Sequence, residues 1–86
     1  MMSTKMINFD STSWKSIKDT IQKINEIGEV QFGKTDEGED IFFSVANFGD
    51  EDCLVTEVFQ HNGWVRKNIY HPKDHDIEEL YQKEGK

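Results

Sequence analysis

The segment VFQHNGWVRKNIY, residues 58–70, carries the strongest local fold signal in the chain. Apolar and polar residues alternate on both sides of Asn62-Gly63, which is the pattern of two β-strands joined by a tight turn. An Asn-Gly pair is typical of a two-residue type I′ turn, because both residues accept positive φ angles. We therefore predict a β-hairpin whose loop consists of Asn62 and Gly63.

The length of this loop decides which side chains share a face of the hairpin. A two-residue loop predicts the cross-strand pairs His61–Trp64, Phe59–Arg66, Glu57–Asn68 and Val55–Tyr70. The other face then holds the aliphatic residues Leu54, Val58, Val65 and Ile69. The sequence thus predicts one aliphatic face and one aromatic face that includes an arginine.

Upstream of the hairpin, residues 10–27 have the pattern of an amphipathic helix. Its apolar residues recur at spacings of three and four, at Trp14, Ile17, Ile21, Ile24 and Ile27. Asp10 is the expected N-cap, with Ser11 or Ser13 as alternatives, and Gly28 suits the left-handed residue that ends a helix. We expect the helix to pack on the sheet through Trp14, Ile17, Ile21 and Ile24.

The remaining segments complete an α-β-β-β-β-α order. Residues 29–34 alternate like a strand, and residues 41–48 are apolar on both parities, which is typical of a central strand covered on both sides. Residues 76–84 predict a short helix, with Asp76 as its cap and Ile77, Leu80 and Tyr81 as its apolar face. Short connections favour a four-stranded antiparallel meander with the long helix on one face, a two-layer α+β domain.

Length and composition indicate a single domain over residues 1–86, with flexible ends expected at 1–8 and 84–86. Hydrophobic residues make up 35% and aromatic residues 12% of the chain, enough for a core. The one cysteine, Cys53, excludes an intramolecular disulfide and a multi-cysteine zinc site. With no signal-peptide or membrane-spanning pattern, we expect a cytoplasmic protein.

The net charge of −7 is concentrated in the middle of the chain. Two acidic clusters stand out: Asp36, Glu37, Glu39 and Asp40 form the first, and Asp50, Glu51 and Asp52 form the second. Such a charge disfavours direct binding to nucleic acid or to anionic membranes. The clusters either keep the protein soluble or attract a partner with a basic surface.

Chemical motifs are absent from the sequence. His71, Asp74, His75 and Asp76 are the densest group of possible metal ligands, but Pro72 indicates a loop, and we predict neither a metal site nor a cofactor. Acidic neighbours raise the pKa of a thiol, which argues against Cys53 as a nucleophile. No phosphate-binding loop or hydrolase motif occurs, so we expect a protein that is not an enzyme.

These observations favour a non-enzymatic binding or inhibitor-type protein that acts on a macromolecular partner. In size, acidity and lack of motifs the chain resembles small phage, immunity or antitoxin-type inhibitors, a resemblance of type and not of residues. The candidate partner-binding residues are Phe59, Trp64, Arg66 and Tyr70, because aromatic and arginine side chains dominate binding hot spots, together with the two acidic clusters. The clusters would imitate nucleic-acid phosphates toward a basic partner.

Three alternatives remain open at this point. The aromatic face could join two copies of the chain in a homo-oligomer. It could instead lie under the C-terminal helix as a second core. A small molecule could also bind between the sheet and that helix.

Overall fold

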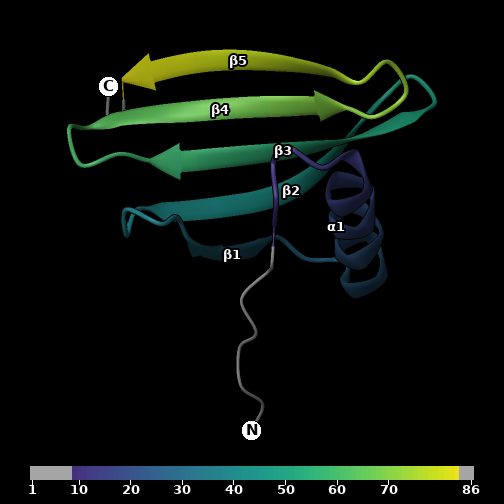
Figure 1. Ribbon diagram of the computed structural model, residues 1–86, viewed down its shortest axis with the longest axis horizontal. Coiled ribbons are helices and arrows are strands. Elements are labelled where there is room, and N and C mark those ends of the chain that lie inside the picture. Colours follow the sequence, from purple (N-terminus) through teal and green to yellow (C-terminus); the bar gives the residue numbers. More distant parts are fainter. Residues whose placement is uncertain (1–8, 84–86) are drawn as a thin grey trace, which may run out of the picture.

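The structure, a computed structural model, describes residues 9–83; the ends expected to be flexible, 1–8 and 84–86, lie outside the described residues. Within the described residues one helix precedes five strands, in the order α1 (Trp14–Ile27), β1 (Gln31–Lys34), β2 (Asp40–Phe48), β3 (Glu51–Phe59), β4 (Trp64–His71) and β5 (Asp76–Lys83). The strands form one antiparallel sheet in the order β1-β2-β3-β4-β5 (Figure 1). The α+β class and the meander are confirmed, and the sheet has one strand more than predicted.

Helix α1 begins one turn later than Asp10, the expected cap. Ser13 is the N-cap, and its hydroxyl accepts a hydrogen bond from the Ser16 N–H at 3.2 Å. Asp10 instead accepts bonds from the N–H and the hydroxyl of Thr12, which lower the pKa of its carboxyl. The helix ends as predicted, because Gly28 adopts a φ of 80° and donates its N–H to the Ile24 carbonyl at 2.7 Å.

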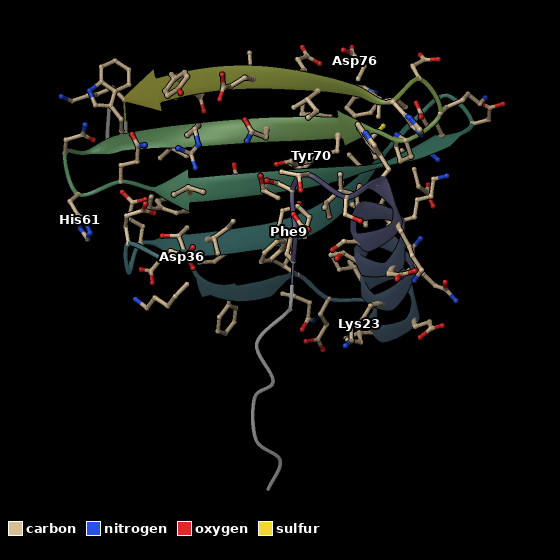
Figure 2. All side chains as sticks on the ribbon, viewed as in Figure 1. Phe9, Lys23, Asp36, His61, Tyr70 and Asp76 are labelled. Atoms are coloured by element: carbon tan, nitrogen blue, oxygen red, sulfur yellow. The ribbon has the colours of Figure 1, made fainter. Side chains whose placement is uncertain are left out.

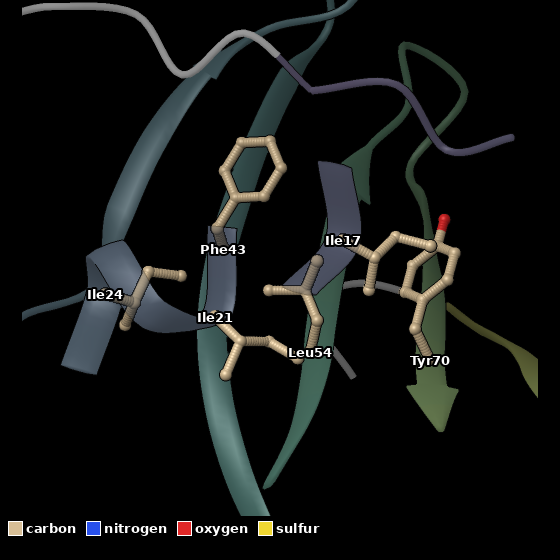
Figure 3. Close-up of a cluster of buried hydrophobic side chains, with 6 residues drawn as sticks. All are labelled: Ile17, Ile21, Ile24, Phe43, Leu54 and Tyr70. Carbon is tan, nitrogen blue, oxygen red and sulfur yellow. The ribbon is translucent and has the colours of Figure 1, made fainter. Parts of the chain in front are cut away.

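The core lies between α1 and one face of the sheet. The helix runs across the strands, near the end of the sheet that carries the β2–β3 and β4–β5 turns (Figure 1). The buried cluster consists of Ile17, Ile21 and Ile24 from the helix with Phe43, Leu54 and Tyr70 from the sheet (Figure 3). Each such side chain contributes about 1.5–3 kcal/mol when fully buried. The predicted packing of Ile17, Ile21 and Ile24 is confirmed and Trp14 packs at the edge, whereas Ile27, the last residue of the predicted stripe, is 47% exposed.

The turn between β3 and β4 differs from the prediction. Its loop has three residues, His61 to Gly63, because the Gln60 N–H bonds the Trp64 carbonyl at 2.8 Å and the Gly63 N–H bonds the Gln60 carbonyl at 3.2 Å. Gly63 has a φ of 88°, whereas Asn62 does not have a positive φ. This is a type I turn followed by a left-handed glycine, the usual three-residue hairpin loop.

The longer loop shifts every predicted cross-strand pair by one residue. Phe59 faces Val65, Val58 faces Arg66 and Leu54 faces Tyr70. A one-residue shift moves one strand's side chains to the other face relative to its neighbour. The predicted aromatic face is therefore wrong: Trp64, Arg66 and Tyr70 lie on the helix side, and Phe59 lies on the opposite side.

Residues 76–83 form strand β5 and not the predicted helix. They pair with β4 along its length, with Ile77 opposite Tyr70 and Tyr81 opposite Arg66. A helix here would leave the outer backbone groups of β4 without partners, whereas a strand supplies them. Pairing of this kind overrides the helix propensity of the glutamates, leucine and glutamine in the segment. Among residues 9–83, no C-terminal helix therefore covers a face of the sheet.

Strand β2 is covered on one side only, which corrects its expected position as a strand buried on both sides. Phe43 faces α1 and is buried, whereas Phe42, on the other side, is 38% exposed. Within residues 9–83, no helix or strand lies over this second face, which we name the uncovered face. The one helix described is too short and too polar to cross a membrane.

Candidate functional site

A row of three phenylalanines crosses the uncovered face. Phe32 on β1 pairs with Phe42 on β2, and their ring centroids are 5.9 Å apart. Phe59 on β3 is the diagonal neighbour of Phe42, and their centroids are 5.3 Å apart in an edge-on arrangement. We name these three residues the aromatic row. In tilted and edge-on contact across three strands, they form a continuous apolar strip.

The aromatic row lies beside a buried apolar floor. Val55, Val65 and Ile69 are only 7–8% exposed, although no described element covers them. Larger side chains at the margins stay in solvent: Phe32 is 58% exposed, Phe48 49% and Leu80 42%. The charged pair Glu57–Lys67 lies on the same face, directly beside Phe42. The aromatic row is therefore the contiguous part of the exposed apolar surface, and contiguous surface marks interaction sites more often than isolated apolar residues do.

The two acidic clusters lie at opposite ends of the sheet. The β1–β2 turn carries the first cluster, and the β2–β3 turn carries the second (Figure 1). Figure 2 shows Asp36 at the same end as His61, with Asp76 at the other. A strand as long as β2 spans roughly 30 Å. The clusters thus border the uncovered face at both ends and do not form one acidic stripe.

The second cluster is tied into the fold by its own hydrogen bonds. Asp52 accepts bonds from the side-chain amides of Asn47 at 2.8 Å and Asn25 at 3.0 Å, and these bonds lower the pKa of its carboxyl. Asp50 lies 3.4 Å from the ammonium of Lys73. In the first cluster, Asp40 pairs with Lys34 at 2.6 Å, while the side chains of Asp36 and Glu37 are exposed. The first cluster is therefore the more accessible to a partner.

Trp64 and Arg66 lie on the helix side, beyond the part of the sheet that α1 covers. Trp64 is 38% exposed, and the ammonium of Lys83 lies 5.4 Å from the centre of its ring. Arg66 lines a cleft of about 300 Å³ whose other walls include Asp36, Asn68 and Tyr70. The side-chain oxygen of Asn68 is buried there and has no hydrogen-bond partner among the described residues. Tyr70 is buried in the core, at 3% exposure.

The four possible metal ligands of residues 71–76 do not converge. His75 stacks on Trp14 at 4.7 Å between ring centroids. His71 instead turns toward Cys53, with 3.2 Å between Nδ1 and Sγ. The sequence-based reasoning missed this contact because it assumed the two-residue loop. With a three-residue loop, the hairpin pairing places Cys53 opposite His71. A prediction that considered this longer loop would therefore have found the contact.

Comparison of the chain with protein-family models, curated proteins and solved structures found no match.

Proposed function

We propose that this is a non-enzymatic binding protein that holds a protein partner against the uncovered face of its sheet. The observation that carries the proposal is the aromatic row, exposed on a face that no described element covers. Aromatic side chains supply a large contact area at low entropic cost and dominate binding hot spots. The contact therefore centres on Phe42, the middle ring of the row.

The dimensions of the face suit a protein partner. Five strands spaced by about 4.8 Å, four of them roughly 26–30 Å long and β1 about half that length, present roughly 600 Å². An interface of this size on both partners buries about 1,200 Å², the lower end of the range for specific complexes. A small molecule would cover only part of such a flat surface. The face is thus large enough for one folded domain or one amphipathic segment.

Charge defines the chemistry of that partner. The acidic clusters at both ends of the face favour an apolar patch bordered by lysine and arginine side chains. In a face-to-face homodimer the strands of the two sheets align within about 30°, so acidic turns would meet acidic turns. Like-charge contacts of this kind oppose self-association. The arrangement therefore favours a basic partner over a second copy.

Binding experiments with matched variants test this proposal. The immobilised protein should retain a partner from an extract of the native host, and the double variant Phe32→Ala, Phe42→Ala should bind that purified partner about 30-fold more weakly or worse. Tyr81→Ala is the control, because Tyr81 is 56% exposed but lies on the other face of the sheet. Equal losses from both variants, or from neither, would overturn the proposal.

Light scattering of the purified protein tests whether two copies of the chain associate. We expect a monomer, and higher salt should leave it monomeric while slowing association with the basic partner. A dimer that the Phe32→Ala, Phe42→Ala variant splits would assign the face to self-association instead.

The cleft on the helix side favours a second candidate function, the binding of a small polar molecule. Arg66 and Asn68 both line it, and the buried side-chain oxygen of Asn68 has no hydrogen-bond partner among the described residues. Its volume of about 300 Å³ is at the lower limit of ordinary ligand sites. A compound screen followed by thermal unfolding should yield ligands whose stabilising effect disappears in the Asn68→Ala variant. Stabilisation that persists in Asn68→Ala would place the ligand elsewhere.

A further inference from the structure

Three metal-ligating side chains of different chemistry meet on the uncovered face, at the end near the β2–β3 turn. They are Glu51 and Cys53 of β3 and His71 of β4, and their ligand atoms all lie within 4.8 Å of one another. The pairing of Leu54 with Tyr70 brings Cys53 and His71 opposite each other. Glu51, two residues before Cys53, points to the same side of the sheet. The cluster is thus a product of the strand register.

We propose that Glu51, Cys53 and His71 bind a divalent transition-metal ion of the Zn²⁺ class. Tetrahedral zinc with ordinary bond lengths separates its sulfur, nitrogen and oxygen ligands by about 3.4 to 3.6 Å. The observed separations are 3.2 Å from Sγ to Nδ1 and 3.6 Å from Nδ1 to the Glu51 Oε1. The third separation, from Sγ to the Glu51 carboxylate, is at most 4.8 Å, so the ion would draw these two ligands closer together while the other two pairs need only small adjustments.

Groups around the cluster hold its ligands in the binding orientation. The backbone N–H of Lys73 donates to Oε2 of Glu51 at 2.6 Å, which leaves Oε1 directed at His71. Oε1 of Glu78, on β5, lies 3.6 Å from Nε2 of His71. A carboxylate that accepts a hydrogen bond from the distal nitrogen of a histidine fixes the tautomer that offers the other nitrogen to a metal, and a small shift of the Glu78 side chain would make that bond. Such second-sphere support is typical of metal sites.

The charges of the three ligands also suit a divalent cation. When the ion binds, the sulfur–metal bond forms and the thiol proton leaves to solvent. A thiolate, a carboxylate and a neutral imidazole then cancel the two positive charges of the ion. A neutral complex suits a site whose sulfur is fully buried.

The ion can reach the site from solvent, and the site offers the donor atoms that zinc-type ions prefer. The side chains of His71 and Glu51 are 21% and 16% exposed, so the ion enters from solvent past them to the buried sulfur. Sulfur and imidazole together favour zinc-type ions, whereas the acidic turns offer oxygen alone and suit Ca²⁺ or Mg²⁺. Bound there, the ion would join β3 to β4 independently of any partner.

Titration of the purified, metal-free protein with Zn²⁺ and with Co²⁺ tests the site. We expect one equivalent to bind, and Co²⁺ to give the near-ultraviolet charge-transfer absorption of a thiolate–cobalt bond. Cys53→Ser should abolish that absorption. His71→Ala should weaken Zn²⁺ binding by more than about 100-fold, since removal of an outer carboxylate alone costs 10–100-fold. Glu78→Gln should fall within that smaller range and, with a 54% exposed side chain, should fold normally.

The control variant is His61→Ala, which removes an exposed histidine from the far end of the hairpin. It should bind both metals like the unchanged protein. Circular dichroism verifies that each variant is folded. If His71→Ala does not fold, Glu78→Gln still tests the proposal. The absence of thiolate–cobalt absorption, or equal Zn²⁺ affinity in the unchanged and Cys53→Ser proteins, would overturn the proposal and leave a hydrogen-bonded thiol only.

Discussion

The two faces of the sheet are built from the same alternation of apolar and polar residues but end in different environments. On one face, Phe43, Leu54 and Tyr70 lie under the isoleucines of α1 and are at most 3% exposed. On the other, Phe42 and Phe32 are exposed because nothing described lies over them. Apolar periodicity thus shows which residues share a face, but only the supply of a second layer decides whether that face is core.

The largest expected effect tests the covered face. Tyr70→Ala should lower the free energy of unfolding by about 3–5 kcal/mol, the usual cost of removing a buried aromatic side chain. Tyr70 contacts Phe9 and Trp14 edge-on, at 5.7 and 6.4 Å between centroids, so the cavity would open in the centre of the core. Urea unfolding followed by circular dichroism measures the change.

Trp64→Ala is the matched control for Tyr70→Ala, because both residues belong to β4 and point to the same side. Trp64 lies beyond α1 and is 38% exposed. Its removal should cost about 1 kcal/mol, in the range of substitutions away from the core. Similar losses from the two variants would mean that the helix side is buried along the whole of β4, contrary to the structure.

The second effect tests whether water reaches the buried thiol of Cys53, at the end of the uncovered face near the β2–β3 turn. Cys53 is fully buried there, and burial with the neighbouring Glu51 raises the pKa of its thiol from 9.0 to about 11. Because the folded state holds this proton more tightly than the unfolded state, the stabilisation is complete below pH 9 and is lost as pH rises toward 11. The loss is on the order of 2 kcal/mol.

Unfolding in urea at pH 9 and pH 11, with chelator present, measures this effect. Other groups titrate in the same range, so Cys53→Ser is the reference. The unchanged protein should lose more stability than the variant across this interval. Parallel losses would show that the thiol has an ordinary pKa, and hence that water reaches this end of the uncovered face.

The third effect tests the loop that assigns side chains to the two faces. Gly63→Ala should cost about 1–2 kcal/mol, because alanine is strained at the observed φ of 88°. An added Cβ meets nothing closer than Lys83 Cε at 4.0 Å, so the cost is backbone strain and not a clash. His61→Pro should change stability by less than about 0.5 kcal/mol, because proline suits the first central position of a type I turn. A large loss of stability in His61→Pro would indicate that the loop has two residues and not three.

This loop also shows how far the sequence alone could be read. The helix and the four strands up to residue 71 follow from periodicity and from glycine positions, and their existence was predicted. The pair Asn62-Gly63, however, is compatible with a two-residue and with a three-residue loop, and the choice moves Tyr70 from one face to the other. The contact between Cys53 and His71 depends on that same choice. The residues of the loop do not by themselves show which of the two loop conformations has the lower free energy.

Strand β5 could not be predicted for a different reason. Its residues form helices readily in isolation, and its side chains are exposed on both faces, so no burial pattern marks it as a strand. What decides its conformation is the free edge of β4, a feature of the assembled sheet. The aromatic row was missed in turn, because a helix over residues 76–84 was expected to leave less of the sheet open.

The smallest effect on stability tests the uncovered face itself. Phe42→Ala should lower the free energy of unfolding by about 1 kcal/mol or less, because the side chain is 38% exposed and loses mainly its contacts with Phe32 and Phe59. The melting temperature of the unchanged protein should also be independent of protein concentration. Stability that rises with concentration, and no longer does so in Phe42→Ala, would show that a second copy covers the face, since association stabilises the folded state by mass action. A loss of 3 kcal/mol or more at every concentration would instead show that the ring is buried within the monomer, and the two faces would no longer differ.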